Sequence, residues 1–402
     1  MWETRAVGTN LADLVQDAAS RRPDSAAIVE AERTTTWAQV ERLVRAVSGG
    51  LAVRGLAPGD RVAMVLGNSL EFVTTYFGIL RAGLIAVPIN TAYTPAEIGE
   101  LLASSGAKIV IADHRSVGAV RDAASNDVTV VEVGSDGWRR LTVGSAPPPN
   151  YDTDPESIAL LIYTSGTSGK PRGAMLSHRA LMANLDQLSA LHDPAPMLAD
   201  DVALIVLPLF HIYALNAALG LVAKHAATAV LSNRFDPRTA LDLVRDHRVT
   251  NIAGAPPMYV AWSAEPHVAE RMRGVRMLNS GAAPLSPTVF SQFATSGLTI
   301  WEGYGMTEAS PVIASNAVSG HAKPGFVGLP IPGVEVKLVD DRGNDVDDGD
   351  PGEIYVRGAN LFSGYWPDGA DGPGEDGWWA TGDVAITDEE GSLRLVDRRR
   401  DL

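Results

Sequence analysis

The segment Tyr163–Gly173, with the sequence YTSGTSGKPRG, concentrates residue types that can hold phosphate groups. Hydroxyl groups and glycine N–H groups can converge on phosphate oxygens, and Lys170 adds a positive charge. The segment is not a Walker A loop, because only two residues separate Gly166 from Gly169 and Pro171 follows the lysine. Its composition therefore predicts phosphate binding by a loop of another kind.

The setting of this loop supports the prediction. The apolar run Ile158–Tyr163 predicts a strand, and a helix is expected to start near Ser177. Ligands of α/β sheets bind beyond the carboxyl ends of strands, where a loop between such elements lies. The alternative is a flexible surface loop, since runs of Gly, Ser and Thr are common in loops.

A second segment, Trp301–Glu308 with the sequence WEGYGMTE, suits an aromatic base. Tyr304 stands between Gly303 and Gly305, and glycines let a backbone approach a ligand closely. The segment lacks the third glycine of a dinucleotide-binding fingerprint. It predicts a tyrosine that lies flat against a purine, and the alternative is an ordinary strand-to-loop turn.

Two carboxylates and a threonine complete the candidate chemistry. Thr307 can donate a hydrogen bond to a phosphate, and Glu308 can hold Mg²⁺. Asp383 ends the run WWATGD and suits the hydroxyls of a ribose, as acidic residues do at dinucleotide sites. Aspartate after glycine is also typical of turns, which is the alternative for Asp383.

The composition of the 402-residue chain is that of a globular protein, with 46% hydrophobic and 20% charged residues. Its length predicts two or three subdomains. The net charge of −15 argues against a broad nucleic-acid-binding surface, although a local cradle of N–H groups can still bind an anion. The chain has no cysteine, which excludes disulfides, zinc–thiolate sites and thiol nucleophiles.

We expect neither a secretory signal nor a transmembrane segment. We expect a cytoplasmic location. Residues 1–10 lack an apolar core. Pro208, His211 and Asn216 interrupt the long apolar stretch Val202–Ala223, and no basic cluster flanks it. We therefore expect a buried strand, a turn at Pro208 and a buried helix.

The elements that would position these groups alternate between helix and strand patterns up to about residue 332. Apolar residues at helical spacing predict helices at 10–20, with Asn10 as N-cap, and at 36–54. Short β-rich runs begin at Arg61, Lys108, Val128, Ile158, Ala203, Ala227 and Val249. This alternation predicts an α/β fold with two largely parallel sheets covered by helices.

The pattern changes after about Gly333. The short alternating runs EVKLVD, GEIYVRG and SLRLVD are separated by turns rich in Asp and Gly. They predict a smaller antiparallel β subdomain at about 333–397, following α/β subdomains at about 1–332.

Together these segments resemble the adenylate-forming superfamily, which includes acyl-CoA synthetases, aryl-CoA ligases, luciferases and peptide-synthetase adenylation domains. The similarity covers nearly the whole chain and keeps the order of the family's motifs. It also rests on AGLIAVPIN from Ala82, PLFHIYALN from Pro208, NSGAAPL from Asn279, GEIYVRG from Gly352, SGYW from Ser363 and DRRRD from Asp397. The chain is most similar to the large AMP-binding domain of fatty acyl- and 4-coumarate-type CoA ligases.

The resemblance implies binding of ATP and AMP and assigns roles to residues of this sequence. The loop for the β- and γ-phosphates would consist of Thr164, Ser165, Gly166, Thr167 and Lys170. The nucleotide would be lined by Gly281, Ala282, Ala283, Glu302, Gly303, Tyr304 and Gly305. Arg172 stands where lysine is common in the family, and it keeps the positive charge.

The remaining implied roles lie close to the reacting atoms. Tyr304 would stack on the adenine, Thr307 would contact the α-phosphate, and Glu308 would bind Mg²⁺. Asp383 would bind the ribose hydroxyls, helped by Arg398. The implied catalytic set is Thr164, Lys170, His211, Thr307 and Glu308.

The acid-binding region is implied at PLFHIYALN, where His211 resembles an aromatic gate beside the acid carboxylate and Tyr213 would contact the acid. The small residues of this region leave room for a long apolar tail, or alternatively allow close helix packing. They are Ala214, Ala217, Ala218 and Gly220. We expect a fatty acid first and an aryl acid second.

The resemblance implies attack of the acid on the α-phosphate of ATP, which gives an acyl-adenylate and pyrophosphate, and then transfer of the acyl group to coenzyme A. All reacting groups are anionic, so the site must supply positive potential. The family adds a lysine from a small C-terminal domain, joined at a hinge that matches residues 398–402. We expect residues 1–397 to be the large domain alone, which would form the adenylate slowly.

Three other functions are left open. A nucleotide-binding module without turnover would carry the same loops. A peptide-synthetase adenylation domain usually has an aspartate in or near NSGAAPL, and this chain has none in that motif. A hydrolase is disfavoured because the chain lacks a G-x-S-x-G elbow and an HExxH pair. The identity of the acid and the oligomeric state are open as well.

Overall fold

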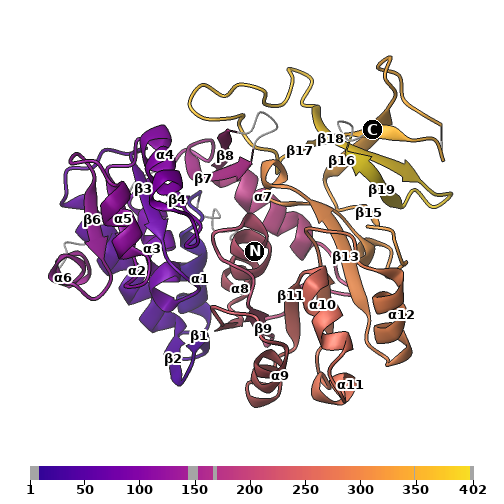
Figure 1. Cartoon of the computed structure of the whole chain (residues 1–402), viewed down its shortest axis with the longest axis horizontal. Coiled ribbons are helices and arrows are strands. Elements are labelled where there is room, and N and C mark those ends of the chain that lie inside the picture. The colour runs from indigo at the N-terminus through magenta and orange to yellow at the C-terminus, as the bar shows by residue number, and fades with distance from the viewer. Residues whose placement is uncertain (1–8, 144–152, 166–169, 348, 399–402) are drawn as a thin grey trace, which may run out of the picture.

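Three sheets organise the computed structural model, which describes residues 9–143, 153–165, 170–347 and 349–398 (Figure 1). Two large, mostly parallel sheets have helices between them and on their outer faces. A smaller antiparallel sheet, drawn in yellow in Figure 1, lies beside the second large sheet. The predicted α/β fold with two largely parallel sheets and a smaller antiparallel unit is confirmed.

The first large sheet has the strand order β6-β5-β3-β4-β7-β8. Its strands are β3 (Arg61–Val65), β4 (Ile85–Pro88), β5 (Ile109–Ala112), β6 (Thr129–Glu132), β7 (Ile158–Ser165) and β8 (Pro171–Ser177). Neighbours run parallel except β7 and β8, which form an antiparallel hairpin. The helices of this part are α2 (Trp37–Ala52), α3 (Leu70–Arg81), α4 (Pro95–Ser105), α5 (Val117–Ala123) and α6 (Asp136–Thr142).

The starts of two of these helices follow from local sequence. Thr36 accepts a hydrogen bond from the Gln39 N–H group, and the Gln39 side chain accepts from the Thr36 N–H group. Thr94 and Glu97 make the same reciprocal pair at the start of α4. Such a capping box satisfies backbone N–H groups that a helix start leaves unpaired, so it fixes where the helix begins.

The second large sheet has the strand order β15-β14-β13-β12-β11-β9-β10-β1-β2. Its strands are β1 (Ala26–Glu30), β2 (Arg33–Thr36), β9 (Val202–Ile205), β10 (Thr228–Leu231), β11 (Asn251–Gly254), β12 (Met277–Ser280), β13 (Ile300–Gly305), β14 (Val312–Ser315) and β15 (Leu329–Pro330). The strands from β13 to β1 run parallel, and the outer pairings are antiparallel. Its outer face packs on α9 (Pro237–Asp246), α10 (Pro256–Ser263) and α12 (Pro287–Thr295), and α11 (Val268–Arg271) follows α10.

The small sheet consists of β16 (Val334–Val339), β17 (Gly352–Gly358), β18 (Trp379–Thr387) and β19 (Leu393–Arg398), all antiparallel. The segment Ser363–Trp366 returns to the first large sheet and pairs with the free edge of β8. The Ser363 N–H group donates to Met175 O at 2.9 Å, and the Met175 N–H group donates to Gly364 O at 3.1 Å. This pairing ties the segment that follows β17 to the edge of β8.

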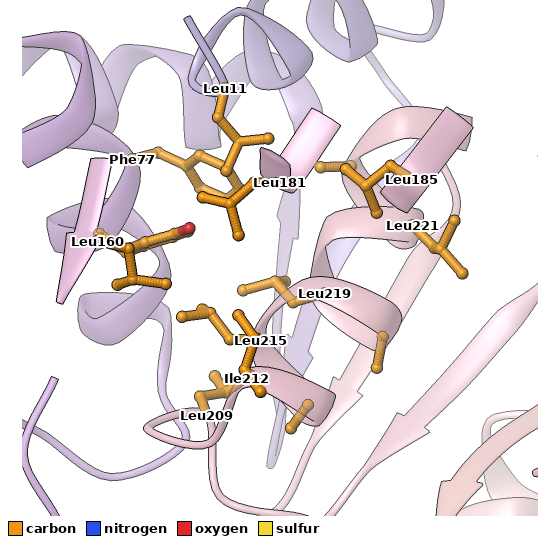
Figure 2. Close-up of a cluster of buried hydrophobic side chains, with 14 of the residues drawn as sticks. Leu11, Phe77, Leu160, Leu181, Leu185, Leu209, Ile212, Leu215, Leu219 and Leu221 are labelled. Atoms are coloured by element: carbon orange, nitrogen blue, oxygen red, sulfur yellow. The ribbon is translucent and has the colours of Figure 1, made fainter. Parts of the chain in front are cut away.

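The main core lies between the two large sheets (Figure 2). Its central helices are α1 (Asp13–Arg21), α7 (His178–Ser189), the π-helix η1 (Tyr213–Gly220) and α8 (Leu221–His225). Figure 2 shows Phe77 of α3, Leu160 of β7, Leu181 of α7 and Leu215 of η1 meeting there. Each fully buried side chain of this kind contributes roughly 1.5–3 kcal/mol, so this core fixes η1 against both sheets.

The structure corrects the predicted element after the phosphate loop. The helix expected near Ser177 is confirmed, since Ser177 caps α7 and the helix begins at His178, but the strand β8 lies between the loop and this helix. The side chains of Ala174 and Leu176 face the central core, whereas Met175 faces the outer helices. This alternation makes β8 a strand that is buried on both faces, and β8 pairs antiparallel with β7.

The apolar stretch 202–223 forms the predicted strand, turn and helix, but the first part of the helix is a π-helix. It forms β9, a turn, the π-helix η1 and the start of α8. None of the helices in the described ranges combines the length and the apolar character that a membrane crossing requires. The first helix begins later than predicted, at Asp13, because Asn10 uses its side chain to accept from the Ala12 N–H group in a preceding turn.

Candidate nucleotide and acid site

A cavity of about 1340 Å³ lies between the nine-stranded sheet, η1, the edge of β8 and the small sheet. Its walls include residues at the carboxyl ends of β12 and β13 and residues in the middle of β18. Ligand sites of α/β proteins lie at this end of the strands, outside their carboxyl termini. The cavity is therefore the candidate site.

One face of the nine-stranded sheet forms a wall of this cavity with three levels. The upper level, at the carboxyl ends, holds Gly281 and Gly303. The middle level holds Ala253, Asn279 and Trp301. The lower level holds Ala203, Asn251 and Met277. The levels arise because alternate residues of a strand face the same side, while Ile252, Leu278 and Ile300 face the outer helices.

Glycines shape the upper end of the cavity. A Cβ placed on Gly305 would lie 2.1 Å from Pro311 O, and one on Gly303 would lie 3.1 Å from Ala314 O. These positions therefore admit only glycine without a shift of the neighbouring backbone. The result is a tight turn between β13 and β14 that presents Tyr304 to the cavity.

Tyr304 and Asp383 meet across the cavity although 79 positions separate them in the chain. The Tyr304 hydroxyl donates a hydrogen bond to Asp383 Oδ2 at 2.7 Å, and Tyr304 is only 8% exposed. Burial, with the Asp383 carboxylate nearby, raises the pKa of Tyr304. Arg398 pairs in register with Asp383 on the adjacent strand β19, and its side chain lies outside the described residues.

Glu308 lies at the start of the turn that follows β13, in the short 3-10 helix η2 (Thr307–Ala309). Glu308 is 6% exposed, and its carboxylate accepts a hydrogen bond from the Tyr365 hydroxyl at 2.6 Å. The Arg172 guanidinium lies 3.7 Å from the centre of the Tyr365 ring and pairs with Asp371 at 2.6 Å. Burial and the Glu308 carboxylate raise the pKa of Tyr365. Thus a cation, an aromatic ring and a carboxylate are stacked beside the phosphate loop.

Three buried carboxamides hold the backbone behind Glu308. Asn216 of η1 donates to Ser310 O at 2.7 Å, and Asn184 of α7 donates to Val312 O at 2.9 Å. Asn360 donates to Ala309 O at 2.8 Å. Because buried carbonyl groups need partners, these bonds fix the turn after Glu308 from three different elements.

The predicted phosphate loop lies beside this cluster, but only part of it is described. Thr164 and Arg172 line the cavity. Lys170 is exposed, and it is not among the residues that line the cavity. Gly166 and Thr167 lie outside the described residues, as does the side chain of Ser165.

The predicted acid-binding residues line the same cavity from η1 and the turn before it. The His211 ring packs on Phe210 with 4.7 Å between ring centres, and desolvation by its surroundings lowers the pKa of its imidazole. Burial raises the pKa of Tyr213. A Cβ on Gly281 would lie 3.4 Å from the Tyr213 ring, so this ring packs under the upper level of the wall. The structure thus brings both residues to the predicted region.

Two predicted nucleotide residues lie elsewhere. The Glu302 carboxylate accepts a hydrogen bond from the Leu285 N–H group at 3.2 Å, and burial raises its pKa. Glu302 alternates with Trp301 and Gly303, so its side chain faces the other side of the sheet. Ala283 is exposed and does not line the cavity, whereas Ala282 and Thr307 do.

Sequence reasoning missed polar and aromatic residues at the middle and lower levels of this wall. Asn279, Asn251 and Trp301 line the cavity from three strands. They lie in three separate segments of the sequence. The signal that could have found them is the alternation, within each strand, of residues that face the cavity and residues that face the outer helices. Tyr365 was seen only as part of the motif SGYW, without its bond to Glu308.

A carboxylate of the cavity could bind a metal ion. Within the described ranges, no three His, Asp or Glu side chains are grouped to hold a metal ion. Glu308 by itself supplies a carboxylate in the cavity. Mg²⁺ commonly takes one or two protein carboxylates and completes its shell with phosphate oxygens and water. The residues present therefore fit a metal ion that arrives with a nucleotide.

Sequence comparison decides the family of the chain. Residues 15–366 match the model of the AMP-binding enzyme family. The chain belongs to the AMP-binding enzyme family. The matched range includes Thr164, Tyr304, Glu308 and Tyr365, which the structure gathers around one cavity, so the suspected resemblance is confirmed.

Relatives within this family are CoA ligases. The chain is 34% identical to 4-coumarate–CoA ligase 3 of Oryza sativa subsp. japonica, over 91% of this chain and 70% of that protein. It is 31% identical to a long-chain-fatty-acid–CoA ligase of Escherichia coli O157:H7, over 98% of this chain and 77% of that protein. Its structure is similar to ATP-bound MatB from Rhodopseudomonas palustris, with a TM-score of 0.90, 31% identity, and coverage of 98% of this chain and 80% of that one. These similarities support an acid–thiol ligase of the AMP-binding family.

Proposed function

We propose that this chain binds ATP and a carboxylic acid in one cavity and joins them as an acyl-adenylate, from which the acyl group passes to coenzyme A. The observation that carries the proposal is the continuity of the cavity. Its upper end contains Tyr304, Asp383 and Glu308, and its lower end is lined mainly by apolar residues of β9, β11, β12 and η1. One end suits a nucleotide and the other an acyl group.

The reaction follows from the order of these groups. A carboxylate oxygen attacks the α-phosphorus of ATP, the bond to the bridging oxygen breaks, and pyrophosphate leaves. We assign Tyr304 to the adenine, Asp383 with Arg398 to the ribose, and Thr307 to the α-phosphate. The phosphate loop contributes Thr164, Ser165, Gly166, Thr167 and Lys170. Donors that are positioned before the reaction stabilise developing charge without reorganisation.

Mg²⁺ and coenzyme A complete the proposal. Glu308 would hold Mg²⁺, which would neutralise phosphate charge when bound. The Tyr365 hydroxyl donates to Glu308 Oε1 and keeps this carboxylate in place. The coenzyme A thiol then attacks the acyl carbonyl carbon, and AMP leaves with the electrons of the broken bond. His211 and Tyr213 border the acid carboxylate in this arrangement.

The identity of the acid, the domain boundaries and the location in the cell stay predictions. The relatives include both a fatty-acid and a 4-coumarate ligase, so a fatty acid and an aryl acid both remain predictions for this chain. Binding of nucleotide without turnover remains the alternative from another class. The same holds for the division into a large domain at 1–397 with a hinge at 398–402, and for a cytoplasmic location.

A thermal-shift series tests the proposal. AMP, ATP, and ATP with Mg²⁺ should each raise the melting temperature, because a ligand of the native state stabilises it by about 2.7 kcal/mol at a concentration 100 times its Kd. Acids that fit the lower end should add to the shift given by ATP with Mg²⁺. Absence of any shift with AMP and ATP would remove the proposal.

A further inference from the structure

Asn68, in the loop between β3 and α3, places a buried carboxamide against loops of the second large sheet. The residue is 4% exposed. Its Nδ2 group donates to Leu207 O and to Ser232 O, both at 3.0 Å. Its Oδ1 atom accepts from the Leu209 N–H group at 2.8 Å. Both donors of this side chain and one lone pair of its oxygen are therefore used by backbone groups of two other loops.

These bonds cross from one large sheet to the other. The strand β3 belongs to the six-stranded sheet, whereas Leu207 and Ser232 follow β9 and β10 of the nine-stranded sheet. Asn68 is not among the residues that line the cavity, but Leu207 is. A side chain outside the cavity thus fixes backbone that borders it.

The backbone that Asn68 holds is the turn between β9 and η1, which carries His211. Leu207 and Leu209 flank Pro208, and Pro208 O accepts from the His211 N–H group at 3.0 Å. The Leu209 side chain is fully buried in the main core. A carboxamide on one side and the core on the other therefore fix the turn from which His211 projects.

The His211 side chain depends on this backbone for its position. Its imidazole is exposed and lines the cavity, where it packs on the ring of Phe210. Phe210 belongs to the same turn, and no hydrogen bond from another described residue holds the imidazole. A shift of the turn would therefore move the ring together with it.

We propose that Asn68 is a positioning residue for the acid, because it holds residues 207–209 so that His211 borders the acid carboxylate. The inference rests on the adenylate-forming function proposed above and adds to it a residue from outside the cavity. Small displacements of groups beside reacting atoms have large effects on binding geometry and rate. Loss of the Asn68 carboxamide should weaken the acid end and spare the nucleotide end, which other elements hold.

Two ligands of the full chain test this role without requiring turnover. AMP occupies the nucleotide end, and a non-hydrolysable acyl-sulfamoyl adenosine occupies both ends. The decanoyl and cinnamoyl compounds are titrated calorimetrically, and the tighter one is used. Asn68→Ala should weaken the acyl compound at least about tenfold and change AMP affinity by less than about twofold.

A double-mutant cycle shows whether Asn68 acts through His211. His211→Ala removes the ring that the turn positions. Adding Asn68→Ala to it should therefore lower the affinity for the acyl compound by less than about a further twofold. Full additivity of the two losses overturns the inference, because Asn68 would then act independently of His211.

Hydrogen exchange reports on the turn itself. The Leu209 amide is protected by its bond to Asn68, so in Asn68→Ala it should exchange at least about tenfold faster, while the amides of β12 exchange as in the unmodified chain. An unchanged rate at Leu209 overturns the inference. If Asn68→Ala does not fold, Asn68→Ser, whose hydroxyl can still accept one bond, replaces it in all three measurements.

Asn10→Ala is the matched control. Asn10 is also buried, donates to Leu80 O at 2.8 Å and accepts from the Ala12 N–H group at 2.9 Å, but it does not line the cavity. Its loss should lower stability and leave the ratio of the two affinities unchanged.

The outcomes separate this inference from the proposed function. Equal losses of AMP and acyl-compound affinity in Asn68→Ala, or no loss of either, overturn the inference while the nucleotide site stands. If neither ligand binds the unmodified chain, the proposed function fails, and the exchange rate at Leu209 then decides whether Asn68 fixes the turn.

Discussion

The two ends of the cavity differ in how their polar groups are satisfied. At the nucleotide end, Asp383 and Glu308 each accept a hydrogen bond from a tyrosine hydroxyl, and glycines hold the backbone in one conformation. At the acid end, Asn279 and the Oδ1 atom of Asn251 line the cavity and no described group bonds them. One end is held by bonds within the protein, whereas the other leaves polar groups of the described residues open to the cavity.

This difference has a physical reason. Positioned groups cost no reorganisation when charge develops at a phosphate, so rigidity at the nucleotide end serves the proposed chemistry. Unpaired groups at the acid end instead make binding depend on what the ligand offers. The following predictions test whether the two ends are as separate as the structure indicates, from the largest effect to the smallest.

The largest effect is expected from Gly305→Val. Its Cβ would lie 2.1 Å from Pro311 O, and two backbones cannot both stay in place. We expect a loss of about 3 kcal/mol in the free energy of unfolding and a fall of more than about 100-fold in AMP affinity. Urea denaturation and calorimetric titration measure the two quantities.

Gly118→Ala is the control for this change. Gly118 lies in α5, and no heavy atom lies within 4 Å of a Cβ placed there. Alanine should stabilise the protein by up to about 1 kcal/mol, because it is the better helix former. Normal AMP binding by Gly305→Val would show that the tight turn is not what positions the nucleotide end.

The next effect concerns α7, which supports both ends. It starts at His178, bonds Val312 through Asn184 and lines the acid end with Leu188. His178 is 2% exposed and accepts from the Leu11 N–H group at 3.0 Å, and burial lowers its pKa to about 4.

The sign of the pH dependence follows from that lowered pKa. The unfolded chain binds a proton below pH ~6.5 while the folded chain stays neutral to about pH 4, so stability falls as pH decreases through this window. We expect a loss of about 3 kcal/mol, measured by urea denaturation at several pH values. His178→Asn keeps an acceptor for Leu11 and should flatten this dependence. Identical pH profiles for both proteins would refute the assignment.

A third prediction separates the ends directly. Asp383→Ala should lower AMP affinity about 30-fold, or about 2 kcal/mol, because a half-buried charged acceptor for the ribose is lost. Asp350→Ala, at an exposed turn, serves as the control and should bind AMP normally. AMP binding that is unchanged in Asp383→Ala would show that the ribose assignment is wrong.

The smallest effect is expected at the acid end. Ala217→Leu adds a side chain to the wall formed by η1. It should weaken an acyl-sulfamoyl adenosine about tenfold through steric crowding and leave AMP affinity within about twofold. Equal losses for both ligands would mean that the two ends respond as one unit.

Much of the nucleotide end could be predicted from sequence because its residues come in contiguous segments. Tyr304, Thr307 and Glu308 follow one another on β13 and the turn after it, and Asp383 stands in a recognisable run on β18. The exception is instructive. Glu302 belongs to the same segment, but strand alternation places its side chain on the opposite face.

Predictions of the acid end were less complete, again because strand alternation decides which residues face the cavity. Its wall takes every second residue from four strands, β9, β11, β12 and β13, which lie side by side in the sheet but are separated by helices in the chain. The hairpin formed by β7 and β8 was also missed, since burial of β8 on both faces depends on helices distant in sequence.

The sequence by itself determined the fold class and the family, because local motifs and alternating apolar patterns specify them, and it predicted which segments bind the nucleotide. Only the tertiary structure decided which groups meet. It placed Tyr304 on Asp383 and Tyr365 on Glu308, and it left Asn279 facing the cavity. Contacts of this kind depend on how strands are ordered and on which face each residue takes, and neither is encoded within a single segment.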